Sequence, residues 1–117
     1  PYYYRTPKRG EIVVFKSALG DKKYYVKRCI GLPGDTLYIK KGIVYINNEP
    51  LIITGVRIQR DYAYFDKITI PDSHYFVLGD NRSQSADSRY WGFVKEDQFK
   101  GKALFTWWPL GRMRVLR

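Results

Sequence analysis

Residues 24–35, YYVKRCIGLPGD, constrain the fold more than any other stretch of this sequence. They place a lysine in the middle of an apolar run of residues that favour β-strands. The run ends at Gly31-Leu32-Pro33-Gly34, which predicts a sharp turn because glycine and proline supply the backbone angles of turns. Side chains alternate along a strand, so three residues share each face. Tyr25, Lys27 and Cys29 are expected on one face, and Val26, Arg28 and Ile30 on the other.

Lys27 has two interpretations. In the first, its neighbours on the strand face exclude water, and desolvation favours the neutral amine that a general base requires. In the second, its stem packs at the edge of a sheet while its ammonium group stays in water, as for most strand lysines. The run alone favours the second interpretation.

A second segment, residues 79–94, reads GDNRSQSADSRYWGFV and is crowded with hydroxyls, carboxylates and arginines. It follows a short apolar run at residues 75–78. Polar loops of this density usually carry function, because a rigid scaffold positions them while they contribute few core contacts. The segment is therefore the second candidate part of a functional site.

The remaining pattern predicts a single all-β domain over residues 1–117. Helical periodicity never lasts ten residues, and eleven tyrosines suit half-buried strands better than helices. We expect a coiled, partly open β-barrel. Strands are predicted at residues 11–15, 36–40, 43–47, 67–70, 75–78, 103–108 and 112–116, with a hairpin turn at Lys41-Gly42, a turn at Gly20-Asp21 and one helical turn within 95–100.

The formal charge of +10 is unevenly distributed. Residues 1–60 hold 12 Lys and Arg against 4 Asp and Glu, whereas residues 61–117 hold 9 against 7. A basic half rich in tyrosine is compatible with nucleic acid, through phosphates and stacking, or with an anionic lipid surface. One histidine, His74, and one cysteine, Cys29, leave little for a histidine-based triad, a metal site or a disulfide.

The sequence has no apolar run near the eighteen or so residues that span a bilayer, and it begins at Pro1 rather than methionine. We expect it to be a piece of a longer protein, with any anchor or targeting segment ahead of Pro1.

Taken together, the motifs resemble those of the bacterial type I signal peptidases, membrane-bound serine proteases with a Ser-Lys dyad. The matching pieces are RGEIVVF at residues 9–15, VKRCIGLPGD at 26–35, GDNRSQSADSRYWGFV at 79–94 and GKALFTWWPLGRMRVL at 101–116, in the family's order. Residues 47–69 fall outside the likeness and are expected to be a variable insert.

The resemblance implies a role for each matching residue. Lys27 would be the general base that takes the proton from a serine hydroxyl, and Ser85 would orient the lysine. Four charged residues would hold the site in place around them, and three others would line the substrate cleft. The supporting residues are Arg28, Asp80, Asp87 and Arg89, and the cleft residues are Val14, Tyr25 and Val26. Asp80 and Asp87 are the candidate ion-pair partners of Arg28. The family implies no metal and no cofactor.

One departure from the family pattern concerns the nucleophile. The family's serine lies in a Ser-Met-x-Pro-like motif ahead of the RGEIVVF strand, where this sequence has no serine, and Ser17 lies on the wrong side of that strand. The same stretch supplies part of the family's oxyanion hole. We therefore expect the chain alone to be inactive.

The first functional hypothesis is thus a signal peptidase core, held at the extracytoplasmic side of the cell membrane by an anchor ahead of Pro1. Its expected partners are the signal-peptide region of exported preproteins and the anionic membrane surface, with no nucleic acid. Two alternatives stay open: an inactive homologue used as a binding module, and a basic β-domain that binds nucleic acid.

Overall fold

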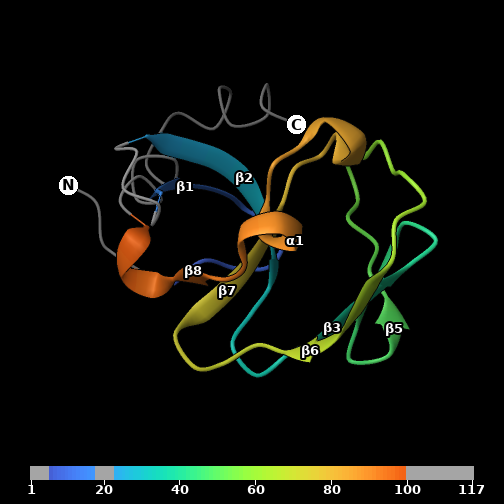
Figure 1. The fold of residues 1–117 in the computed structure, drawn as a ribbon, viewed down its shortest axis with the longest axis horizontal. Coiled ribbons are helices and arrows are strands. Elements are labelled where there is room, and N and C mark those ends of the chain that lie inside the picture. The colour runs from blue at the N-terminus through green and yellow to red at the C-terminus, as the bar shows by residue number, and fades with distance from the viewer. Residues whose placement is uncertain (1–5, 18–22, 100–117) are drawn as a thin grey trace.

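The computed structural model of the protein describes residues 6–17 and 23–99 (Figure 1). Short strands dominate the described residues. They are β1 (Ile12–Lys16), β2 (Tyr24–Gly31), β3 (Thr36–Lys40), β4 (Ile43–Ile46), β5 (Glu49–Pro50), β6 (Phe65–Thr69), β7 (His74–Leu78) and β8 (Val94–Lys95). The helical elements are one turn of α-helix, α1 (Ser88–Trp91), and the 3-10 turns η1 (Arg82–Gln84) and η2 (Glu96–Gln98).

The strands form two antiparallel sheets, which confirms the all-β class. One sheet has the order β1-β2-β7-β8 and the other β5-β4-β3-β6, and Figure 1 shows them side by side, with α1 in front of β7. An isolated bridge from Phe15 to Phe99 brings the end of the described chain back to β1. The first sheet is therefore strongly coiled, but over the described residues the two sheets do not close into a barrel.

Strand β7 is buried on both faces and organises the core. Phe76 and Leu78 pack into the cluster that joins the two sheets, which also contains Ile30 and Leu37. Tyr75 and Val77 point the other way, into a second cluster. That second cluster contains Val13, Phe15, Cys29, Val94 and Phe99. Because alternate side chains serve different cores, the strand that leads into residues 79–94 is fixed from both sides.

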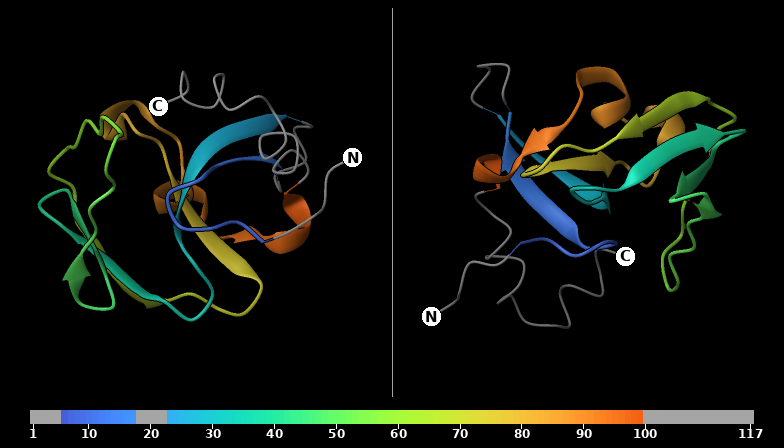
Figure 2. Two further views of the ribbon diagram at one scale, coloured as in Figure 1. Left: turned by 180° about the vertical axis from the view of Figure 1, so that it is seen from behind. Right: turned by 90° about the horizontal axis from the view of Figure 1, so that it is seen from below.

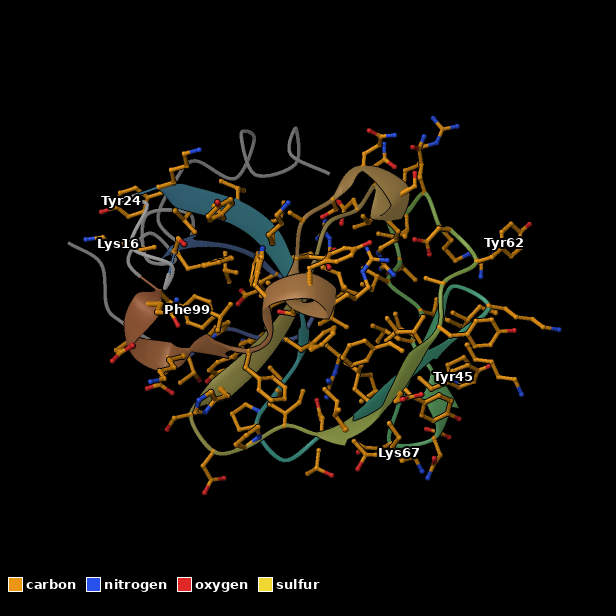
Figure 3. The ribbon with its side chains drawn as sticks, in the orientation of Figure 1. Lys16, Tyr24, Tyr45, Tyr62, Lys67 and Phe99 are labelled. Atoms are coloured by element: carbon orange, nitrogen blue, oxygen red, sulfur yellow. The ribbon has the colours of Figure 1, made fainter. Side chains whose placement is uncertain are left out.

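Two hairpin turns of the second sheet follow directly from their sequences. Lys41 and Gly42 connect β3 to β4, and Asn47 and Asn48 connect β4 to β5. All four residues have positive φ, between 51° and 79°, as two-residue hairpin loops of this kind require. Glycine and asparagine adopt this conformation at low cost. The predicted hairpin at Lys41-Gly42 is confirmed. Figure 3 shows Tyr45 at the outer rim of this sheet.

The turn that ends β2 also forms as predicted. Asp35 N donates to Leu32 O at 3.0 Å, and Leu32 N donates to the Asp35 carboxylate at 2.8 Å. Gly34 adopts φ +87°. Gly31 is required for a different reason, since a Cβ there would lie 2.3 Å from Ile70 Cδ1. The turn therefore packs directly against the core between the sheets.

Other elements depart from the prediction in their bounds. The strand expected at residues 67–70 runs over Phe65–Thr69, and the turn expected within 95–100 is the 3-10 turn Glu96–Gln98, preceded by β8. Helix α1 was not predicted, because its four residues are too few for a periodic pattern. The expected strands at 103–108 and 112–116 and the turn at Gly20-Asp21 lie outside the described residues.

Among residues 6–17 and 23–99, no helix has the length and apolar character needed to cross a bilayer.

Candidate active site

Lys27 and Ser85 come together although 58 positions separate them in the sequence. Lys27 lies on β2 opposite Val13 of β1, a fully buried residue, so its stem borders the second core cluster. Its Nζ donates to Ser85 Oγ at 3.2 Å. The contact is partly buried. The lysine is thus half-buried, with its amine held against a hydroxyl rather than extended into water.

Gly79 leaves the space in which these two side chains meet. A Cβ at this position would lie 2.0 Å from Ser85 Oγ, 2.5 Å from Ser85 Cβ and 3.7 Å from Lys27 Nζ. Contacts below 3.0 Å do not occur for real Cβ atoms, so any side chain at Gly79 would displace Ser85. Gly79 was not among the predicted site residues. Its place at the end of a buried strand, ahead of a polar loop, is the signal that could have identified it.

Arg28 makes the ion pair that was expected of it, and its partner is Asp80. The Arg28 guanidinium donates from Nε and Nη2 to the two Asp80 oxygens, each at 2.8 Å, and from Nη1 to Gly10 O at 2.6 Å. The Arg28 side chain is only 4% exposed. A bidentate arginine–carboxylate pair fixes orientation as well as distance. It ties the start of the polar segment to β2, one residue from Lys27.

Asp87, the other candidate partner of Arg28, pairs instead with Arg89. The Asp87 carboxylate is fully buried and accepts from Arg89 Nε at 2.9 Å, from Arg89 Nη2 at 3.0 Å and from Gly79 N at 3.1 Å. It also accepts from Arg89 N at 3.2 Å and so caps α1. Ser88 Oγ in turn accepts from Val77 N at 2.9 Å. These bonds hold both ends of the loop that carries Ser85.

Asp61, in the segment expected to be a variable insert, is also joined to this loop. Arg89 Nη1 donates to Asp61 Oδ2 at 3.0 Å, and Arg89 Nη2 to Arg82 O at 2.6 Å. Gln59 N donates to Asp80 O at 2.8 Å, which makes a short parallel bridge. Both views of Figure 2 keep η1 close to this segment. Local sequence gave no signal for Asp61, because the contact is made across 28 positions.

Burial and the neighbouring charges shift the pKa values of Arg89 and Asp61 in opposite directions. Burial disfavours the charged form of Arg89, but the hydrogen bonds and negative charge of Asp87 and Asp61 outweigh it and raise the pKa of Arg89. Burial likewise opposes ionisation of Asp61, yet the hydrogen bonds from Ala63 N and Arg89 lower the pKa of Asp61. Both groups therefore stay charged and paired at neutral pH.

The three predicted cleft residues do not share one face. Val14 lies opposite Val26 across β1 and β2, on the side away from Lys27, while Tyr25 lies on the Lys27 side against Phe15 and Trp91. Val26 is 53% exposed. The strand period of two explains this division, because neighbouring residues point to opposite faces. Their assignment to a substrate cleft stays a prediction.

Cys29 is a core residue rather than a second reactive group. It is fully buried, and burial, followed by the charge of Glu11, raises the pKa of the thiol to about 12. In the part of the chain that the structure describes, no group of three His, Cys, Asp or Glu side chains could hold a metal ion.

The fold and these contacts define the class of protein: an all-β domain that presents a lysine and a serine hydroxyl side by side. Residues 1–108 match the family described as "Signal peptidase, peptidase S26". The chain belongs to this family.

Similar proteins support the same assignment. "Probable signal peptidase I-2" of Synechocystis is 42% identical over 98% of this chain and 55% of its own length. "Signal peptidase I S" of Bacillus subtilis is 38% identical over 91% of this chain and 62% of its own length. The chain therefore spans little more than half the length of these relatives. The crystal structure of a signal peptidase I from Enterococcus faecalis superposes with a TM-score of 0.72 at 34% identity, covering 86% of this chain and 98% of that chain.

Proposed function

We propose that this chain is the lysine-bearing part of a serine endopeptidase that removes signal peptides from exported preproteins. The observation that carries the proposal is the contact of 3.2 Å between Lys27 Nζ and Ser85 Oγ, in a chain that belongs to the signal peptidase family. Lys27 is the general base and Ser85 the residue that orients it. Arg28, Asp80, Asp87 and Arg89 keep the loop of Ser85 in place.

The nucleophile in this proposal is a serine supplied by a segment ahead of residue 1. Its hydroxyl oxygen attacks the scissile carbonyl carbon while the neutral Lys27 amine takes its proton. The resulting ammonium then protonates the leaving amine, and the peptide bond breaks. Water, deprotonated by the same amine, finally hydrolyses the ester and regenerates the serine. A single lysine thus acts as base and as acid in turn.

The substrate binds as an extended strand beside β2. Among the described residues, the pairing of β2 with β7 starts only at Arg28, so the backbone of Val26 and Lys27 lies ahead of it, where a peptide strand can approach. Val26 is 53% exposed, so its side chain is accessible to a bound peptide, which carries small side chains at the first and third positions before the cleaved bond. In the whole protein, an anchor ahead of residue 1 holds the domain at the extracytoplasmic face of the membrane, and the basic residues favour anionic lipid.

The test compares this chain with a form extended at its amino terminus by the residues that its gene encodes upstream. Each is incubated with a peptide that carries an Ala-x-Ala signal, and the products are identified by mass spectrometry. We expect cleavage after the second alanine by the extended form only, and none when its upstream serine is replaced by alanine. Cleavage by the chain alone, free of contaminating peptidase, would place the nucleophile among its own residues and refute the proposal.

A further inference from the structure

A hollow of about 80 Å³ lies beside the second sheet, between the β3–β4 hairpin and residues 51–60. Aliphatic side chains, among them Ile43, Leu51 and Ile58, form most of its wall. Two arginines, Arg60 and Arg82, complete it. A wall of this kind is apolar with a concentrated positive charge, which is not the composition of an ordinary core cavity.

Arg82 is the unusual member of this wall. It is only 5% exposed, and its Nε donates to Gly79 O at 2.8 Å. Within the described residues, its two Nη groups have no hydrogen-bond acceptor and no ion-pair partner. Buried guanidinium donors are almost always satisfied, since an unsatisfied charged donor costs several kcal/mol.

The acidic side chains nearest to Arg82 are already committed to other partners. Asp80 pairs with Arg28, while Asp61 and Asp87 both pair with Arg89. Burial, followed by the positive charge of Arg89, lowers the pKa of Arg82. The positive charge at the hollow is thus incompletely neutralised by the protein itself.

A second hollow of about 500 Å³ adjoins the first, because the two share Ile43, Ile58 and Arg60. Lys41 and Tyr62 extend its wall toward the surface, and Asp61, which is paired with Arg89, completes it. Tyr62 is 85% exposed and lies at the rim of the molecule, on the side of the second sheet (Figure 3). The smaller hollow can take a charged head group, and the larger one can take a chain attached to it.

We propose that these two hollows form a binding site for an oxyanion carried on an aliphatic chain. The oxyanion, a carboxylate or a phosphate monoester, accepts hydrogen bonds from Arg82 and Arg60. The chain packs against the isoleucines that line both hollows. Free fatty acids and lipid phosphates both have this chemistry. The site is separate from Lys27, and its test does not depend on peptidase activity.

Isothermal titration calorimetry with four probes, each below its micelle concentration, tests the proposal. Octanoate and octyl phosphate carry both the charge and the chain, octanol only the chain, and acetate only the charge. We expect saturable binding of the first two, at least about tenfold tighter than either control, where tenfold corresponds to about 1.4 kcal/mol. The tighter of the two identifies the head group. Equal binding of octanoate and octanol, or no saturation, would overturn the proposal.

Variants then locate the bound probe. We expect Arg60→Gln to weaken octanoate about tenfold and Arg82→Gln to weaken it further. Arg57→Gln, an exposed arginine outside both walls, is the matched control and should change affinity less than about twofold.

Arg82 is buried, so its variant can fail to fold, and the proposal must be decided without it. Ile58→Asn weakens the chain contact, whereas Ile52→Asn alters a side chain that is 80% exposed and serves as its control. Loss of octanoate binding in Arg60→Gln and Ile58→Asn, with unfolding midpoints close to that of the parent chain, supports the site. Unchanged binding in both variants places the ligand elsewhere and refutes it.

Discussion

The two faces of β2 carry adjacent basic residues in contrasting surroundings. Lys27 meets a hydroxyl, Ser85 Oγ, and within the described residues it has no carboxylate ion-pair partner. Arg28, the next residue, is almost fully buried and accompanied by both oxygens of Asp80 and a carbonyl. Successive side chains of a strand point to opposite sides of the sheet. The same short segment therefore places Lys27 against Ser85 on one side and Arg28 against Asp80 on the other.

The contrast shows why the polar loop needs both kinds of contact. A carboxylate beside Lys27 would stabilise its ammonium form and prevent it from accepting a proton, whereas a neutral hydroxyl can aim the amine without adding charge. The carboxylates are instead bound by arginines, namely Asp80 by Arg28 and Asp87 by Arg89. The charged pairs therefore support the loop, and in the proposed mechanism the proton transfer is left to Lys27.

The largest expected effect is on Lys27, in the form of the protein that carries the upstream serine. Lys27→Ala should lower kcat by at least about 10²-fold and up to about 10⁴-fold, the usual contribution of a general base. Lys27→Arg should not restore activity, because a guanidinium stays protonated. Both variants should unfold near the midpoint of the parent, as measured by circular dichroism. Near-normal turnover by Lys27→Arg would exclude the base assignment and remove the functional contrast with Arg28.

On the other face, Arg28→Gln should act on stability. It leaves Asp80 without its bidentate partner. Breaking a buried ion pair lowers the free energy of unfolding by about 3–5 kcal/mol. We expect the lower end of that range, because Asp80 is 33% exposed. Urea unfolding of this chain measures the loss. Arg57→Gln, an exposed arginine, is the control and should lie within about 0.5 kcal/mol of the parent. A stable Arg28→Gln chain would show that the ion pair is not what fixes the loop.

Gly79→Ala should affect the Lys27 face by displacing a side chain. The added methyl would lie 2.0 Å from Ser85 Oγ, so the serine must move, and a shift of about 1 Å at an active site can cost about 10²-fold in rate. The matched test is the same change in a Ser85→Gly background, where both clashing atoms are gone. We expect Gly79→Ala to cost little there beyond the loss from Ser85→Gly. Equal losses in the two backgrounds would contradict the steric explanation.

The sequence was sufficient for features that depend on neighbouring residues. Alternation along residues 24–31 predicted that Lys27 and Arg28 would face opposite ways. The hairpin at Lys41-Gly42 followed from turn chemistry, which is also local. The family motifs paired Lys27 with Ser85, and that contact is present in the structure at 3.2 Å. Local rules and motifs thus predicted most strands and the contact between Lys27 and Ser85.

Contacts between distant segments that the family motifs do not cover were beyond the same reasoning. Asp61 joins Arg89 from a segment with no strand pattern, and Arg82 lines a hollow with residues of the β3–β4 hairpin. The grouping of Val14 and Val26 with Tyr25 also came from motif positions, which do not say where the face of a sheet changes. Such features depend on how two sheets pack, which one strand does not encode.

The smallest expected effect concerns a second ion pair on the Arg28 side of the molecule, between Arg9 and Asp35. Arg9 Nη1 also donates to Ile30 O at 3.1 Å, and Ile30 shares the Arg28 face. Burial of Asp35 opposes ionisation, but the hydrogen bonds from Arg9 and Leu32 N and the charge of Arg9 outweigh it, and the pKa of Asp35 falls below its ordinary 3.8. The ionised form is thus favoured more in the folded state than in the unfolded one.

The sign of the pH dependence follows from this lowered pKa. Because the folded pKa lies below the unfolded value of 3.8, the contribution of Asp35 is fully present above about pH 5 and is lost as pH falls below 3.8 through the folded pKa. Asp35→Asn should therefore cost about 1–2 kcal/mol at pH 7 and less in acid. Urea unfolding of the parent and the variant at pH 7, 5 and 3 measures the difference. A gap that stays constant from pH 7 to pH 3 would show that Asp35 acts through its shape rather than its charge.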